Sequence, residues 1–320
     1  MNIRRIITLA IAFIALVIMI CSFTACSGKG LTNVFLTHYE SQTIDISDDF
    51  SDISIETDTA DVQFLISEDD KCHVVAYTQK NINYDAKVES GTLKISIHDD
   101  REWYEYIQVG VESSSLTVYL PKNEYSALKL KGSTSDVILS GNFKFEDIDI
   151  GISTGDIDVS ASATGNVSLK TSTGDIDLSD MSAASISLTV SSGEIEVENV
   201  VSAGDFTINV STGDAEIENM TCVNFSSEGS TGNLEMENVI ASGNITIARS
   251  TGAVSLYACD AAELDIKMGT GDVKGVLLTS KIFITRTSTG KIDVPESTEG
   301  GKCKIVTSTG DIKFEIADGN

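Results

Sequence analysis

Apolar and polar residues alternate along most of this 320-residue chain, and from residue 153 onward the alternation repeats at a fixed period. Nine copies of one short phrase, the first being Ser153-Thr-Gly-Asp-Ile-Asp-Val159, place a glycine every 19 or 20 residues. These corner glycines are Gly155, Gly174, Gly193, Gly213, Gly232, Gly252, Gly271, Gly290 and Gly310. A period of this length is typical of one supersecondary unit that stacks on itself.

Each period holds two strand-like runs. In Asp156-Ile-Asp-Val159 the residues two and four after the glycine are apolar, and the residues one and three after it are acidic. A second run such as Ile186-x-Leu188-x-Val190 follows, and an apolar residue also recurs seven positions after the glycine, as at Met181. Such alternation predicts half-buried strands, and stacking pairs each strand with its copy in the next coil. The sequence therefore predicts an all-β fold, a parallel, right-handed β-solenoid (β-helix) with coils of 19–20 residues.

The Ser-Thr-Gly phrase predicts a sharp corner. Glycine reaches a positive φ at no steric cost, and serine and threonine hydroxyls can bond backbone groups nearby. A β-branched residue at Gly174 or Gly213 is therefore expected to cost about 1–3 kcal/mol through backbone strain.

The pattern divides the chain into four parts. Residues 1–26 read as a signal peptide or membrane anchor, and residues 27–43 as a tether. Residues 44–131 alternate less regularly, which predicts irregular N-terminal β coils that also cap one end. Residues 132–320 are the regular solenoid repeats, beginning with a decayed first copy.

The far end of the array shows no separate capping motif after the last repeat. An open edge strand invites pairing with another chain, and charged side chains are the usual protection. We expect Asp311, Lys313 and Glu315 to have this role. The pattern predicts either weak end-to-end self-association or a cap folded from the last few residues.

The N-terminus has the features of an export signal. A basic start is followed by an apolar run over residues 6–20 and by Phe23-Thr-Ala-Cys26-Ser-Gly. This stretch resembles a bacterial lipoprotein signal, which implies that Cys26 becomes the lipidated first residue. The alternative is an uncleaved signal-anchor helix that is just long enough to span a bilayer. Both interpretations place the rest of the chain outside the cytoplasm, anchored to the bacterial cell membrane.

Charge and cysteine usage narrow the possible partners. The chain has 48 acidic and 22 basic residues, a formal net charge of −26, which argues against nucleic acid as a partner and favours cations or basic surfaces. Four cysteines lie beyond the signal, without the spacing of a metal site: Cys72, Cys222, Cys259 and Cys303. Aligned on the repeat, Cys259 and Cys303 fall on apolar core positions.

Acidic residues recur one and three positions after the glycine, where side chains are expected to face outward. These candidate metal ligands are Asp156, Asp158, Asp175, Asp177, Glu194, Glu196, Asp214 and Glu216. Stacked coils would bring like charges to about 5 Å, and a hard cation such as Ca²⁺ would relieve that repulsion. The alternative is a solvated face that needs no cofactor and keeps the rod soluble.

The repeated Ser-Thr-Gly-Asp-Ile-x-Val, the Leu120-Pro121 that closes a strand and the export signal together resemble a bacterial "putative adhesin" domain family of unknown function. The likeness covers residues 44–318. It implies a surface β-solenoid, often membrane-anchored, with a role in adhesion or envelope stress. It supplies no catalytic residues.

We therefore predict a non-catalytic cell-surface solenoid, an adhesin or envelope scaffold that presents an acidic face to an unknown surface or envelope ligand. One alternative is an envelope-stress or signalling accessory protein. A second is a calcium-assisted polysaccharide lyase, although the only arginines in the repeats, Arg249 and Arg286, look like ion-paired structural residues. Carbohydrate binding on Trp103, Tyr104 and Tyr106 would need these aromatic side chains to be exposed.

Overall fold

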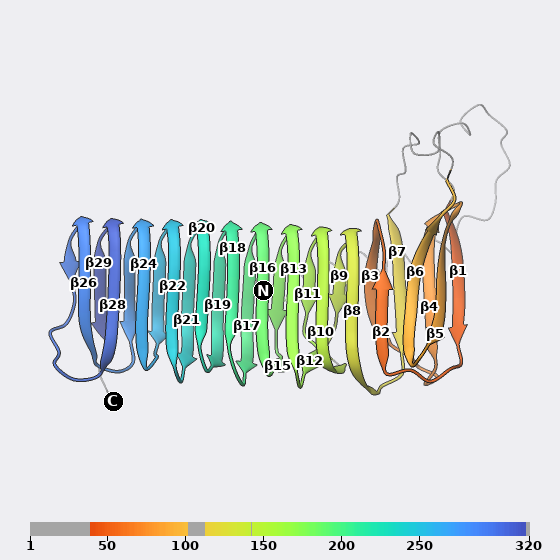
Figure 1. Cartoon of the computed structure of the whole chain (residues 1–320), viewed down its shortest axis with the longest axis horizontal. Helices are drawn as coiled ribbons and strands as arrows, with labels where there is room; N and C mark the ends of the chain where they lie inside the picture. The colour runs from red at the N-terminus through yellow and green to blue at the C-terminus, as the bar shows by residue number, and fades with distance from the viewer. Residues whose placement is uncertain (1–38, 102–112, 142, 318–320) are drawn as a thin grey trace, which may run out of the picture.

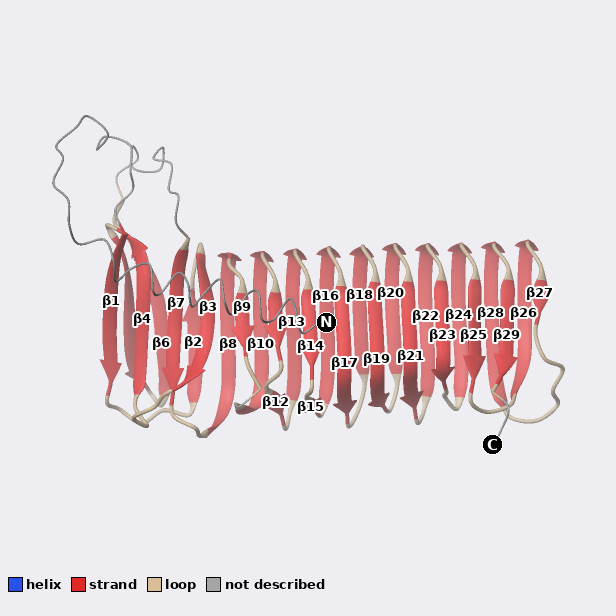
Figure 2. Cartoon of the chain, turned by 180° about the vertical axis from the view of Figure 1, so that it is seen from behind, coloured by secondary structure: helices blue, strands red, loops and turns tan. Residues whose placement is uncertain are grey.

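The computed structural model describes residues 39–101, 113–141 and 143–317, and over these ranges the chain is all-β, with no helix. Two long sheets lie face to face and form a rod, with the N-terminal strands at one end and the C-terminal coils at the other (Figures 1 and 2). The predicted signal or anchor, including Cys26, lies outside the described residues. The predicted tether ends earlier than expected, because residues 39–43 already belong to the first strand.

Sheet 1 has 15 strands. In spatial order they are β1 (Tyr39–Ile46), β4 (Cys72–Gln79), β7 (Ser114–Leu120), β3 (Ala60–Ile66), β9 (Val137–Leu139), β11 (Ile157–Val159), β14 (Ile176–Ser179), β17 (Ile195–Ser202), β19 (Ala215–Cys222), β21 (Leu234–Ala241), β23 (Val254–Cys259), β25 (Val273–Leu277), β29 (Ile312–Ile316) and β27 (Ile292–Asp293), with β15 (Ser182–Ala183) beside β17.

Sheet 2 has 14 strands. Their order is β26 (Lys281–Thr289), β28 (Gly301–Thr309), β24 (Glu263–Thr270), β22 (Asn244–Thr251), β20 (Phe225–Thr231), β18 (Phe206–Thr212), β16 (Ser185–Ser192), β13 (Asn166–Thr173), β10 (Lys144–Thr154), β8 (Glu124–Thr134), β2 (Asp52–Glu56), β6 (Thr92–Asp99) and β5 (Ile82–Glu89), with β12 (Ser162–Ala163) beside β10.

The regular part is a stack of parallel coils, as the repeat predicted. Ile157 pairs with Ile176, Ile176 with Ile195, and Ile195 with Ala215, so equivalent positions of successive coils are neighbours. All four are 0–1% exposed. The predicted apolar position seven residues after the glycine is also buried, and Cys259 occupies it. Because each coil buries its inner face only against its neighbours, the core is one continuous column.

The two corners of each coil use different residues. The nine corner glycines have φ between 124° and 152°, and a Cβ atom at Gly174 would overlap the carbonyl oxygen of Gly155 in the coil below. The second corner, six residues after the glycine, holds residues with φ of 51–56°: Asp180, Asn199, Asn219, Asn238 and Ala258. Asparagine and aspartate tolerate this left-handed conformation. The amide of Asn199 also bonds Asp180 Oδ1 at 3.0 Å, which links neighbouring coils.

At the N-terminal end, where the sequence predicted irregular β coils, the strands do not all pair in parallel. β1 and β7 both run antiparallel to β4, and β5 runs antiparallel to β6. One of these reversals is local, because Ser90 and Gly91, with φ of 53° and 80°, join β5 to β6 in a hairpin. Asn81, with φ of 70°, turns the chain from β4 in sheet 1 into β5 in sheet 2. The antiparallel strands β1 and β5 are the last strands of the two sheets and cap the rod.

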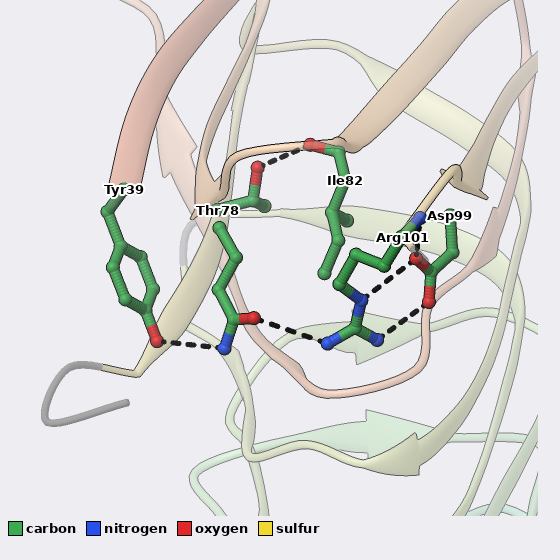
Figure 3. Close-up of polar contacts among 6 residues, drawn as sticks. Tyr39, Thr78, Ile82, Asp99 and Arg101 are labelled. Carbon is green, nitrogen blue, oxygen red and sulfur yellow. Dashed lines mark hydrogen bonds and ion pairs between the residues drawn. The ribbon is translucent and has the colours of Figure 1, made fainter. Parts of the chain in front are cut away.

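Polar contacts tie the cap together at its open corner (Figure 3). Arg101 donates two hydrogen bonds to Asp99, at 2.9 and 2.6 Å, and a third to Gln79 at 3.2 Å. Gln79 in turn donates to the hydroxyl of Tyr39 at 3.3 Å. On the neighbouring turn, the Thr78 hydroxyl donates to the carbonyl oxygen of Ile82 at 2.7 Å. This cluster connects β1, β4 and the end of β6.

At the C-terminal end, the order of the coils differs from the order of the chain. The final coil, made of β28 and β29 (residues 301–316), lies between the coil of β24 and β25 and the coil of β26 and β27. Asp311, Lys313 and Glu315 therefore do not protect an open edge, as we had expected. The outermost strands among the described residues are β26 and β27.

Candidate functional site

Two columns of carboxylates run across the outer face of sheet 1. In the first, three residues after the corner glycine, Asp158, Asp177, Glu196, Glu216 and Glu235 are consecutive register partners. In the second, five residues after the glycine, Glu198, Glu218 and Glu237 are partners in the same way. We call these eight side chains the acidic columns. Neighbouring strands are about 4.8 Å apart, so each carboxylate has a like charge on the next coil.

The pKa values of this face reflect burial and repulsion. Partial burial, followed by repulsion from Glu196 and Asp158, raises the pKa of Asp177 to about 6. Burial also raises the pKa of Asp158. The pKa of Glu216 is raised by desolvation and then by its neighbours, Glu218 first. Ionisation of these side chains is therefore less favourable in the folded chain than in the unfolded chain, and a cationic ligand would favour it.

The acidic residues one position after the glycine have a different role. Asp156 Oδ1 accepts a hydrogen bond from the backbone N–H of Asp175 at 2.8 Å, and Asp175 Oδ1 accepts one from Glu194 at 2.7 Å. Asp214 and Asn233 continue the pattern with the next coils. A carboxylate or amide oxygen thus satisfies a turn N–H of the following coil. These side chains are structural acceptors at the corner, rather than free members of a charged face.

A shallow groove of 390 Å³ lies on sheet 1 at the end of the acidic columns. Glu216, Glu235 and Glu237 line one side. Lys274 and the ion pair of Lys313 with Glu315 (3.1 Å) line the other. Tyr257 lies between them. It is 59% exposed, more than any other large hydrophobic residue in the described part of the chain. Tyr257 is the register partner of Glu237, so its ring continues the second acidic column.

The floor of the groove depends on a substitution in the repeat. Gly275 stands at the inward position that Leu256 and Phe314 occupy in the coils on either side. A side chain at Gly275 would meet the ring of Phe314, which already fills that space. The ring of Phe314 on the next coil therefore fills the space that a side chain at Gly275 would occupy, and the sheet remains continuous beneath the groove.

The described residues do not form a preformed calcium site. Among the described residues, no group of three or more His, Cys, Asp and Glu side chains is placed to hold a metal ion. Of the eight candidate ligands, Asp158, Asp177, Glu196 and Glu216 lie in the acidic columns, while Asp156, Asp175 and Asp214 accept corner amides. Glu194 lies in the same corner column as these three. Calcium binding stays a prediction.

Arg249 differs from our expectation of an ion-paired residue. Its side chain points into the core and is 4% exposed, with hydrogen bonds at 3.3 Å to the carbonyl oxygen of Gly232 and to the Ser227 hydroxyl. Its Nε has no hydrogen-bond partner, and burial lowers the pKa of its guanidinium. Gly229, the register partner on the previous coil, provides the space. A buried arginine cannot meet a substrate on the outer face.

Of the remaining candidates, the four cysteines beyond the signal are free and buried. Trp103, Tyr104 and Tyr106 lie outside the described residues, so their proposed sugar platform is untested. In the cap, His73 lies between Asp45 and Asp69, with nitrogen–oxygen distances of 2.7 and 2.9 Å. These contacts, Asp45 first, raise the pKa of His73.

The fold and the acidic columns define the class of protein. The chain is an all-β, two-sheet parallel solenoid, and the carboxylates on one of its sheets are arranged in columns. The Toastrack family model, DUF4097, matches the chain twice, over residues 50–209 and 201–319. The chain belongs to this family, and the resemblance predicted from its repeat is confirmed. The two matches meet inside the regular stack, at β17 and β18, where the sheets continue without a break.

Solved structures align with the chain at low sequence identity. A putative adhesin from Parabacteroides distasonis aligns with a TM-score of 0.51 at 11% identity, covering 87% of this chain and 97% of that one. A putative lipid binding protein from the same species aligns at 0.49 and 18% identity, covering 87% and 98%. A putative adhesin from Bacteroides fragilis aligns at 0.43 and 13%, covering 87% and 97%. The first of these likenesses shows a shared fold. No curated protein matches the chain.

Among the described residues no helix has the length and apolar character needed to cross a membrane.

Proposed function

We propose that this protein is a non-catalytic cell-surface solenoid, an adhesin or envelope scaffold, that presents its acidic columns to a positively charged ligand or surface. The observation that carries the proposal is the register of the columns, which places eight carboxylates on one face of adjacent coils. The raised pKa values of Asp177 and Glu216 add support, because a cationic partner would relieve the repulsion that raises them. The description of a structural neighbour as a putative adhesin agrees with this role.

Attachment to the membrane belongs to the same proposal. Lipidation at Cys26, or an uncleaved anchor helix in its place, would hold the rod at the bacterial cell membrane and leave the acidic face free. Mass spectrometry of the protein purified from membranes tests this, because a diacylglyceryl group on Cys26 would distinguish a lipoprotein from an anchored helix.

Carboxyl footprinting tests the ligand-binding face. The chain is treated with a carbodiimide and an amine, with and without a lysine-rich peptide, and modification at each carboxylate is measured by mass spectrometry. We expect the peptide to protect Glu216, Glu235 and Glu237 on sheet 1. Exposed carboxylates on sheet 2, at Glu146, Glu228 and Glu263, serve as the internal control. Equal protection on both sheets would show that binding follows net charge only, and would refute the proposal.

Calcium remains a subsidiary hypothesis for the same face. If Ca²⁺ bridges the acidic columns, it stabilises the folded chain and raises its melting temperature, since it binds the folded state preferentially. Melting curves that coincide in calcium and in chelator would dismiss the ion.

A further inference from the structure

The inserted final coil at the C-terminal end carries an inference that is independent of the acidic face. Residues 278–280 connect β25 to β26. The coil of β26 and β27 does not pair with the coil of β24 and β25, so the chain leaves one coil position between them. Residues 294–300 then lead back, and β28 and β29 enter this position (Figure 1). The slot is therefore bounded on one side by β24 and β25 and on the other by β26 and β27.

The two coils that bound the slot offer complementary hydrogen-bonding groups. Asp311 donates its N–H to Asp272 Oδ1 at 2.8 Å, and its own Oδ1 accepts the N–H of Lys291 at 2.7 Å. If the final coil left the slot, Asp272 could accept the N–H of Lys291 directly. The inward residues also match, because Ile312 lies between Val273 and Ile292. Removal of the final coil thus leaves two surfaces that fit one another.

The connection to the final coil is long enough to reach another molecule. Residues 294–300 can span roughly 23 Å, several times the spacing of about 4.8 Å between coils. The segment contains Pro295, and it ends at Gly300 with φ of 99°. Its own polar contacts within the described residues are local, as between the Ser297 hydroxyl and the Glu299 carbonyl at 2.9 Å.

The end of the rod is also apolar. Leu278, Ile284 and Ile292 are 42–49% exposed and all belong to the outermost coil or its approach. Lys281, a charge that would protect this edge, is instead buried, with its Nζ 2.7 Å from Asp260 Oδ1. An exposed apolar edge with unpaired strand groups favours association with another sheet edge.

We propose that the final coil, residues 301–317, is exchangeable, and that two copies of this chain associate at this end when the final coil of one enters the slot of the other. The partner is a second copy because the slot fits this coil, with its glycine corner, its aspartate acceptor and its inward apolar residues. Exchange of an identical element conserves every bond of the monomer and adds the contacts between the two ends.

Disulfide trapping between copies tests the exchange. Lys304 lies beside Asp265 on the outer face of sheet 2, with its Nζ 3.6 Å from Asp265 Oδ2. Asp265→Cys and Lys304→Cys are made in separate, isotopically distinct full-length chains, which are mixed, warmed below the melting temperature and oxidised. Because adjacent strands meet the distance requirement of a disulfide, we expect the covalent mixed dimer linked through these two positions.

The matched control replaces Asp265→Cys by Thr246→Cys. Thr246 is the register partner of Asp265 on β22, one coil further from Lys304, so it links to position 304 by random collision only. We expect the linkage from position 265 to exceed this control at least five-fold. The double variant Asp265→Cys/Lys304→Cys, oxidised within one chain, should lose the ability to exchange and remain monomeric in light scattering. Equal linkage from positions 265 and 246, or an oxidised double variant that still dimerises, would overturn the proposal.

Discussion

At the scale of single residues, two separate constraints require glycine at the corners. Their φ of 124–152° lies in the region that other residues rarely adopt, and the neighbouring coil leaves no room for a Cβ atom. The sequence points to the first requirement only. The second follows from stacking, because the carbonyl oxygen of one corner lies directly beneath the glycine of the next.

We predict that Gly174→Ala destabilises the chain by about 2–5 kcal/mol, since backbone strain and steric overlap add. Thermal or urea unfolding measures the loss. Gly151→Ala is the matched control: Gly151 lies in β10, has no positive φ, and has nothing within 4 Å of its added Cβ. A Gly174→Ala chain as stable as Gly151→Ala would contradict this account of the corner.

The acidic columns predict that stability rises as the pH falls from about 7 to about 5. Asp177 has a folded pKa of about 6 against 3.8 in the unfolded chain, so the folded state binds more protons in this interval. Its contribution is complete below pH 3.8 and is lost as the pH rises through about 6. Asp158 and Glu216, whose pKa values are also raised, act in the same direction. His73 does so too, because its pKa is raised above 6.5.

Asp177→Asn isolates this contribution. We predict a gain of about 1–2 kcal/mol at pH 7.5, where removal of the charge relieves repulsion and desolvation, and little gain at pH 4. Melting temperatures over that pH range measure it. Glu228→Gln removes the same charge from an exposed position on sheet 2 and should change little. A pH profile of Asp177→Asn parallel to that of the wild type would refute the assignment.

At the scale of strands and coils, the repeat was enough to predict the parallel stack. The alternation around Ile157, Ile176 and Ile195 defines an inward face, and the constant spacing of glycines defines the register. The second corner is also visible in the sequence, since Asn199, Asn219 and Asn238 recur six residues after the glycine and asparagine tolerates a positive φ. The β5–β6 hairpin gave a weaker signal in Ser90-Gly91, which two-residue turns favour.

Two features could not be derived from local pattern. The coil of residues 281–293 and the final coil carry the same corner phrase, so nothing in either one determines which is outermost; that depends on how the connections at 278–280 and 294–300 run. The burial of Arg249 likewise depends on a neighbour, because only the aligned coil brings Gly229 beside it. The residues that line the groove come from several coils, and they become adjacent only when the coils are in register.

The order of the last coils yields an element-scale prediction. In a chain that ends at residue 300, the slot is empty, and we expect β26 to pair directly with β24. Position 284 then lies beside position 265, whereas in the full chain Lys304 lies between them. The variant Asp265→Cys/Ile284→Cys should therefore form an internal disulfide in the shortened chain and remain reduced in the full one. The same disulfide yield in both chains would contradict the inserted order.

At the scale of the whole molecule, the rod combines a hairpin cap, a charged face and an apolar end. Long parallel repeats provide an extended surface with equivalent positions at regular intervals, which suits a ligand that is itself extended or repetitive. The net charge of −26 draws any cationic partner to the rod, but only the acidic columns give that attraction a position. The proposed function therefore depends on where the charges lie, rather than on their number.

The affinity of two charge-matched variants for one lysine-rich peptide tests this claim most directly. Glu216, Glu235 and Glu237 on sheet 1 are changed to glutamine in the first variant, and Glu146, Glu228 and Glu263 on sheet 2 in the second. Both variants lose three negative charges. At physiological salt we predict that the first variant binds about tenfold more weakly than the wild type, and that the second stays close to it. Equal weakening of both variants would contradict the assignment of function to the acidic columns.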